Sequence, residues 1–409
     1  MQRSNINRIC IRGFVIRLIA LAITLLFSNQ LTTGFMRSNY DSDDLRYADG
    51  GLYYGQHANS LIDVESFVDA FLSVGDYTGQ ASDIALWYWL VCILSYIFKS
   101  TVIVKIVNIL FGVACIKIIY ELCRIVYPGN EKIAELAAKL YAYMPYPVFF
   151  SCFLYKDQFL CLIFLLIFYL VYKSKNLFNF RDLALLTILL VLFTLTRSGM
   201  LPILIACVGY IEYNKADNKY NKTFYTFISI IVTFVAGYYL YLYNMDVINH
   251  KLDAYVANRA GGSTYNGTFI QHVMVNNIWD IWKIPFAFLF TILQPLYIGG
   301  KIENWNELTG FFNIAFIPVV IGNGLYIFCK EKNNKIFWIV MMVIFSIMIF
   351  VSLGVFRHFY YLMPLPMIFY ADYFLLHGSK NRQMVRKASI SVTTVYAFAM
   401  LIKLFIFNL

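Results

Sequence analysis

Apolar runs of roughly the length that a helix needs to cross a bilayer recur along this chain from residue 14 to the C-terminus. Hydrophobic residues make up 60% of the 409 residues and charged residues 14%, whereas a soluble domain is about half apolar and about a quarter charged. A soluble fold could not bury that much apolar surface. We therefore expect an all-α polytopic membrane protein in which residues 1–409 form one membrane domain.

The Lys and Arg residues of the short polar segments predict the topology, because basic loops stay on the cytoplasmic side. Five such segments are the N-terminus, 173–181, 215–222, 330–335 and 380–387. Together with the weaker basic turn at 124–132, they put the N-terminus inside and predict about eleven spans. The expected spans are 14–35, 101–120, 131–153, 157–173, 182–197, 199–213, 223–243, 309–329, 336–356, 359–377 and 388–408.

Two further apolar segments, 84–98 and 285–298, do not fit as crossings. Counting either one alone as a span would invert the charge bias of the loops that follow it. Both are short for a crossing, and both contain or adjoin tryptophan, which favours the membrane interface. We expect two interfacial or re-entrant helices here, inside extended outer regions at 36–100 and 244–308.

The net charge of +10 comes from basic residues in short turns between spans, where insertion bias places them, so we expect no nucleic-acid partner. The basic start resembles a signal peptide, but no small-residue cleavage site follows it. We interpret it as an uncleaved first span in a bacterial inner membrane. The eight cysteines show neither a Cys-x-x-Cys spacing nor pairing in an outer loop, so they imply no disulfide framework or metal site.

The first outer loop contains nine of the 23 acidic residues and only two arginines. Solvation explains its distal carboxylates, from Asp63 to Asp83. The proximal ones differ, because Asp43 and Asp44 are adjacent and lie close to the end of the first span. Crowded carboxylates at such a boundary raise one another's pKa, bind a divalent cation or act as a base. Asp43 and Asp44 are therefore candidate catalytic residues, and they are the metal ligands if a metal is bound.

The run Asp43-Asp44-Leu45-Arg46-Tyr47-Ala48-Asp49 resembles the Asp-Glu-x-Arg-Tyr-Ala-Glu element that follows the first span of GT-C glycosyltransferases. These enzymes use lipid-linked sugars and include aminoarabinose transferases and protein O-mannosyltransferases. The leading Asp of the element is their catalytic carboxylate, so the resemblance implies that role for Asp43. Asp44 stands where the family has Glu.

The resemblance extends over about residues 14 to 200. The family has interfacial helices between its first and second spans, where segment 84–98 lies. It also tends to have a proline-containing helix end followed by an Asp at the start of the next span, and here Met144-Pro145-Tyr146-Pro147 precedes Asp157. The resemblance thus implies a GT-C-like fold with an outer active site.

Lys156 and Asp157 lie where two apolar helices meet, at a depth where an isolated charge is costly. They could pair with each other, or Lys156 could extend to the interface. Alternatively, Asp157 faces the same outer cavity as Asp43, with Lys156 near a phosphate. Arg197 forms the tip of an outer turn, where simple exposure and phosphate binding explain it equally well.

Arg357 lies at another outer helix end, and its guanidinium fork suits a phosphate of a lipid-linked donor. Lys99, at the end of the interfacial segment, is a further phosphate-binding candidate, although extension to the interface would also explain it. Candidate substrate-binding residues are Tyr47, Arg259 and His358.

These features predict an inverting glycosyltransferase that moves a sugar from a polyprenyl-phosphate donor to a glycan or lipid-linked acceptor at the periplasmic face. A lipid-carried donor needs no nucleotide-binding fold, and the sequence has no Gly-rich phosphate loop. Asp43 would be the general base, and Asp44 and Asp157 would orient the acceptor or hold a divalent cation. The leaving phosphate would be stabilised by Lys156, Arg197 and Arg357.

Two alternatives stay open. An O-antigen or polysaccharide repeat-unit polymerase has a similar length and large outer loops, and it uses lipid-pyrophosphate donors. A transporter or flippase of lipid-linked sugars would need charges near the bilayer midplane and pseudo-symmetric halves. Lys105 and Lys139 are the main charges inside the predicted spans, and the halves show no symmetry, which disfavours transport.

Overall fold

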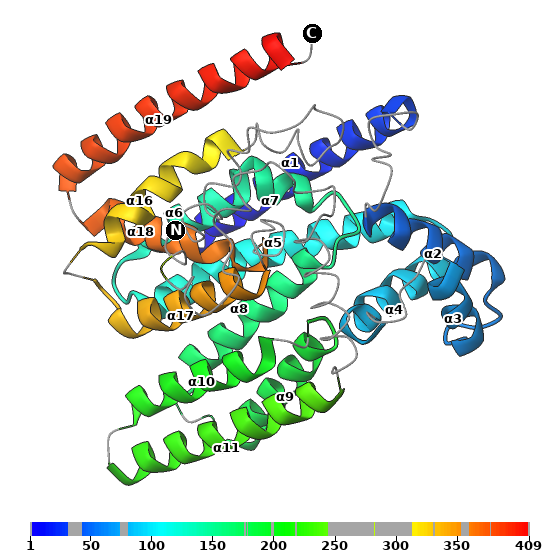
Figure 1. Cartoon of the computed structure of the whole chain (residues 1–409), viewed down its shortest axis with the longest axis horizontal. Coiled ribbons are helices and arrows are strands. Elements are labelled where there is room, and N and C mark those ends of the chain that lie inside the picture. Colours follow the sequence, from blue (N-terminus) through cyan, green and yellow to red (C-terminus); the bar gives the residue numbers. More distant parts are fainter. Residues whose placement is uncertain are drawn as a thin grey trace. The chain divides into compact units, whose positions relative to one another are not determined.

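A computed structural model describes most of the chain, and in the described residues all regular structure is helical (Figure 1). The all-α prediction is confirmed for this part. Two of its helices are long and apolar enough to cross a membrane, Asn5–Leu26 and Thr101–Val126, so the eleven spans stay a prediction. The described residues are 2–31, 43–73, 81–175, 177, 179–197, 200–216, 219–243, 282, 313–329, 332–352, 360–376 and 378–407.

The helices pack as two compact units, which are described in turn. Unit 1 consists of Met1–Tyr40, Tyr127–Phe149 and Asn258–Leu409. Unit 2 consists of Asp41–Val126 and Phe150–Ala257. That the chain forms a single membrane domain stays a prediction.

In unit 1, helix α6 packs against α1 and α18, and α16 packs against α18 and α19. Arg17 of α1 is fully buried, and its guanidinium donates to the carbonyl oxygens of Tyr141 (3.1 Å) and Ala142 (3.0 Å) at the end of α6. The last carbonyls of a helix need partners from outside its regular hydrogen-bond pattern, and a cation suits this end of the helix dipole. The helices are α1 (Gln2–Leu31), α6 (Glu131–Tyr143), η4 (Asn313–Phe316), α16 (Ile317–Ile327), α17 (Lys335–Ser352), α18 (Pro364–Leu376) and α19 (Gly378–Phe407).

In unit 2, α5 packs along α8, α10 along α11, and α2 along α4; α10 and α11 lie side by side in Figure 1. The helices are α2 (Asp43–His57), α3 (Val64–Ser73), α4 (Ala81–Phe98), α5 (Thr101–Val126), α8 (Asp157–Lys173), α9 (Phe180–Thr194), α10 (Leu201–Lys215) and α11 (Lys219–Tyr243). The short α7 (Pro145–Phe150) leads from unit 1 into unit 2.

Glycines let α2 and α4 approach closely. A Cβ on Gly50 would lie 1.8 Å from the hydroxyl of Tyr88, and one on Gly55 would lie 3.1 Å from the carbonyl oxygen of Ser95. Because the earlier glycine faces the earlier residue of α4, the two helices run in the same direction. The starts of α2 and α4 therefore lie at the same end of the pair.

The predicted span 157–173 coincides with α8, whereas the predicted span 131–153 is interrupted. Pro145 disfavours helical backbone at the preceding residue, and Met144 is extended (φ −64°, ψ 131°). Helix α6 alone, with 13 residues, is about 20 Å long, short of the roughly 30 Å of a bilayer core.

Region 36–100, which is predicted to lie on the outer side, is more helical than the sequence suggested. Segment 84–98 forms most of α4, as expected, but the region also contains α2 and α3. The second interfacial segment, 285–298, lies outside the described residues.

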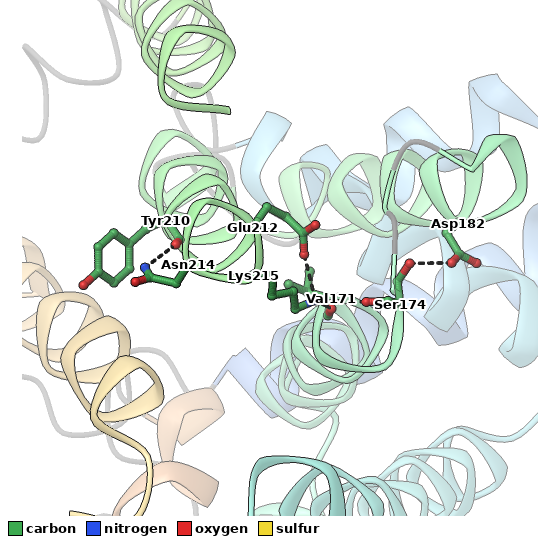
Figure 2. A network of polar contacts seen from close by, with 7 residues as sticks. All are labelled: Val171, Ser174, Asp182, Tyr210, Glu212, Asn214 and Lys215. Carbon is green, nitrogen blue, oxygen red and sulfur yellow. Dashed lines mark hydrogen bonds and ion pairs between the residues drawn. The ribbon is translucent and has the colours of Figure 1, made fainter. Parts of the chain in front are cut away.

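The far end of α8 is tied to α9 and α10 by a polar network (Figure 2). Lys215 Nζ donates to the carbonyl oxygens of Val171 and Ser174 (3.0 Å) and pairs with buried Glu212 at 2.8 Å. The Ser174 hydroxyl donates to Asp182 at 2.6 Å. This network satisfies the last carbonyls of α8 and holds the three helices together at that end.

Candidate functional site

A buried, irregular segment precedes α8, and we call residues 151–156 the connection. Residues 151–155 are buried, and Lys156 is half-buried. Because this backbone is not helical, its carbonyl groups lie outside the regular hydrogen-bond pattern of a helix. Buried carbonyls of this kind need donors from elsewhere in the fold.

Two fully buried side chains supply these donors. Trp87 Nε1 of α4 donates to the carbonyl oxygen of Leu154 at 2.7 Å. Asn108 Nδ2 of α5 donates to the carbonyl oxygens of Phe153 (2.6 Å) and Tyr155 (3.2 Å). Three consecutive carbonyls of the connection are thus bound by side chains from two different helices.

Lys156 and Asp157 come directly after these carbonyls. Asp157 is the first residue of α8 and only 3% exposed; a carboxylate at this position is stabilised by the helix dipole. Lys156 Nζ donates to the carbonyl oxygen of Thr196 at 3.1 Å. Lys156 is therefore held against the turn that bears Arg197.

The turn after α9 lies beside the start of α4. The backbone N–H of Leu86 donates to the carbonyl oxygen of Leu195 at 3.4 Å. The backbone N–H of Arg197 donates to the carbonyl oxygen of Phe193 at 2.7 Å, and its side chain is half-buried. The structure thus brings Lys156, Asp157 and Arg197 to the same end of unit 2.

The acidic element begins α2, with Asp43 and Asp44 in its first turn; their side chains lie outside the described part. Tyr47, one turn later, is buried, and its ring centroid lies 6.1 Å from that of Tyr88. Tyr88 is the neighbour of Trp87, so the start of α2 and the connection are linked through the same turn of α4.

Lys99 is not brought to this end of α4. It comes after the last residue of the helix, about 18 Å along the axis from Trp87. Its Nζ donates to the carbonyl oxygen of Gly55 and lies 4.3 Å from the ring centroid of Tyr96. Lys99 therefore fixes the far ends of α2 and α4 to each other.

Three other candidates, Arg259, Arg357 and His358, lie outside the described residues. Among the side chains that the structure describes, no group of three or more His, Cys, Asp or Glu could hold a metal ion. A divalent cation on Asp43 and Asp44 stays a prediction, because their carboxylates lie outside the described side chains.

Sequence reasoning missed Trp87 and Asn108 as site residues and used Lys105 only as an argument about transport. Lys105 Nζ lies 5.7 Å from the ring centroid of Phe153 in the connection. Lys105 and Asn108 are three residues apart and so share a face of α5. Two polar residues at this spacing in the otherwise apolar stretch 102–116 are a signal that could have pointed to the connection.

Asp63, one of the distal carboxylates, has a structural role. Its carboxylate accepts hydrogen bonds from the backbone N–H of Asn59 (3.0 Å) and from the N–H (3.1 Å) and hydroxyl (3.0 Å) of Ser66. These bonds lower the pKa of Asp63 below its ordinary value, since they favour the charged form. Asp63 is the N-cap of α3.

Comparison with protein-family models, with curated proteins and with solved structures finds no match to this chain.

Proposed function

We propose that the chain is a multi-pass membrane glycosyltransferase of the GT-C type, acting at the periplasmic face of a bacterial inner membrane. It transfers a sugar from a polyprenyl-phosphate donor to a glycan or lipid-linked acceptor. The observation that carries the proposal is that Lys156, Asp157 and Arg197 lie at the same end of unit 2. Helix α4 links the start of α2, with the acidic element, to this same end.

In this proposal, the Asp43 carboxylate accepts the proton of the acceptor hydroxyl. The acceptor oxygen then attacks the anomeric carbon of the donor with inversion. The bond from that carbon to the phosphate oxygen breaks, and polyprenyl phosphate leaves with the bonding electrons. Asp44 and Asp157 orient the acceptor or hold a divalent cation.

The positively charged side chains Lys156 and Arg197 act on the leaving phosphate. Charge develops on the phosphate oxygen as the glycosidic bond breaks, and fixed positive groups in a water-poor site stabilise it strongly. The carbonyl oxygen of Thr196 accepts a hydrogen bond from Lys156 and holds it in place. The ammonium group therefore needs little reorientation when charge develops on the phosphate. Arg197 adds a fork of hydrogen-bond donors on the neighbouring turn.

Packing around the acidic element also supports the proposal. In the helix that begins with Asp43, Tyr47 is buried against α4. The helix start is thus anchored one turn from the proposed base. A carboxylate that only solvated a loop would not need such an anchor.

The proposal is tested by donor class. Purified full-length protein in phospholipid nanodiscs is supplied with radiolabelled polyprenyl-phosphate sugars, and release of free polyprenyl phosphate is measured. The expected result is release that depends on protein and on an added acceptor lipid extract. Turnover of pyrophosphate-linked oligosaccharides into a ladder would overturn the proposal in favour of a polymerase. Movement of either lipid across vesicles without its cleavage would overturn it in favour of a flippase.

A further inference from the structure

We infer that Leu86, Trp87 and Tyr88, the α4 triplet, together with Asn108, hold the three segments of the candidate site in register. These are positioning residues, since none is argued to touch a substrate. The consequence for catalysis rests on the proposed function, whereas the structural claim does not.

Each residue of the α4 triplet contacts a different segment. The N–H of Leu86 binds the turn before Arg197, the indole of Trp87 binds the connection before Lys156, and the ring of Tyr88 packs on Tyr47 of the acidic element. The side chains of consecutive helical residues such as Trp87 and Tyr88 point in directions about 100° apart, whereas the backbone N–H of Leu86 points along the helix axis toward its start. A single turn of α4 can therefore reach three segments that are distant in sequence.

Asn108 completes the arrangement from another side. The carbonyls of Phe153 and Tyr155 are bound by Asn108, and the carbonyl between them is bound by Trp87. The connection is thus bound by α5 through two of these carbonyls and by α4 through the carbonyl between them.

We call these three hydrogen bonds to the carbonyls of residues 153–155 the grip. The grip fixes the position of the residues that follow the connection. Lys156 and Asp157 come directly after the bound carbonyls, and α8 begins at Asp157. The other end of α8 is closed by Lys215. With both ends held, the position of Asp157 is set by the fold before any substrate arrives, which is the condition for a preorganised site.

Reactivity of Cys152 tests the grip without any assay of activity. Cys152 lies in the connection and is fully buried, and Cys161 in α8 is fully buried as well. Full-length protein in nanodiscs is treated with N-ethylmaleimide, and labelling at each cysteine is followed by mass spectrometry. Asn108→Leu should raise the labelling rate of Cys152 by about tenfold or more, since local opening exposes the thiol, and leave Cys161 unchanged.

A matched control exists in unit 1, where Asn323 Nδ2 donates to the carbonyl oxygen of Pro366 at 3.0 Å. Asn323→Leu removes the same type of bond and should leave Cys152 as slow as in the wild type. Trp87→Phe keeps a ring but removes the indole N–H, and it decides the case if Asn108→Leu exposes both cysteines. The inference would be overturned if Trp87→Phe left the labelling rate of Cys152 unchanged. It would also be overturned if the control Asn323→Leu raised that rate as much as Trp87→Phe does.

The catalytic consequence is measured separately. Trp87→Phe should lower kcat for polyprenyl-phosphate release by about tenfold, with the KM for acceptor unchanged, because misplaced groups lose transition-state interactions. If the wild type releases no polyprenyl phosphate, the proposed function fails, and the Cys152 result still decides whether the grip exists. If turnover is present and Trp87→Phe matches the wild type in kcat, the triplet is not a positioning element.

Discussion

The indole N–H of Trp87 and the carbonyl oxygen of Leu154, 67 residues apart in the chain, form a 2.7 Å hydrogen bond inside unit 2. From sequence, the tryptophans of this segment fitted an interfacial anchor. In the structure, Trp87 is fully buried and Trp89 stacks on Phe67 with ring centroids 3.9 Å apart, while the interfacial placement of the helix stays a prediction. The aromatic residues of α4 thus serve internal packing, and one of them binds the segment that precedes the candidate Lys156–Asp157 pair.

Neutralising the proposed phosphate ligands should weaken donor binding. Lys156→Gln and Arg197→Gln should each raise the KM for polyprenyl-phosphate sugar by about tenfold, because each removes a charge-assisted contact of roughly 1.5 kcal/mol. Lys105→Gln should act in the same direction, given its place above Phe153. Lys222→Gln, on α11, is the control. If the KM for the donor is unchanged in all three site variants, the donor phosphate does not bind at this end of unit 2.

Lys215→Met should destabilise the fold and leave donor binding alone. The change strips buried Glu212 of its partner and frees two carbonyls at the end of α8. Leaving the buried Glu212 carboxylate without its partner costs about 3 kcal/mol, which thermal unfolding in detergent would record as a lower Tm.

The double variant Lys215→Met with Glu212→Gln should recover part of that loss, because no uncompensated charge is left. A Tm equal to that of the wild type in the single variant would show that the network in Figure 2 contributes nothing to stability.

The start of α3 should depend on pH through Asp63. Its pKa is lower in the fold than in the unfolded chain, so its carboxylate stabilises the cap above the unfolded pKa of about 4. This stabilisation is lost as the pH falls through the folded pKa. Protease cleavage within α3 should therefore become faster below about pH 4 in the wild type. In Asp63→Ala, cleavage should be fast both above and below about pH 4. Identical pH profiles for the two proteins would contradict the cap.

The predicted topology places residue 59 outside and residue 175 inside. Both lie at exposed positions, so Asn59→Cys and Lys175→Cys can be labelled on intact cells with a membrane-impermeant maleimide, in a background without the partly exposed Cys10 and Cys329. The cysteine introduced at position 59 should react on intact cells, and the one at position 175 should react only after lysis. The reverse pattern would invert the placement of every loop.

How much the sequence reveals depends on the kind of signal. The helix at 157–173 is predictable to the residue, because a continuous apolar run ends there in charge at both sides. The break inside 131–153 was missed, since hydropathy measures length and ignores what Pro145 does to the backbone. Helices α2 and α3 were missed because the prediction followed apolar runs of membrane-crossing length, and both helices are shorter and contain charged residues.

The site shows the same division. Lys156, Asp157 and Arg197 are recognisable from their cost at helix ends, and the structure brings them together. The partners that hold them could not be predicted from sequence, because Trp87 and Asn108 meet the connection only through long-range packing. A tryptophan such as Trp87 is common at a membrane interface, and a single asparagine such as Asn108 is not unusual in a helix.

The proposed reaction depends most directly on Asp43 as the general base. The measurement is the rate of polyprenyl-phosphate release at saturating donor by wild type, Asp43→Asn and the exposed-carboxylate control Asp69→Asn. General-base catalysis contributes about 10²–10⁴-fold, so Asp43→Asn should lose at least about a hundredfold in kcat while Asp69→Asn keeps the wild-type rate. Equal kcat values for Asp43→Asn and wild type would contradict the assignment.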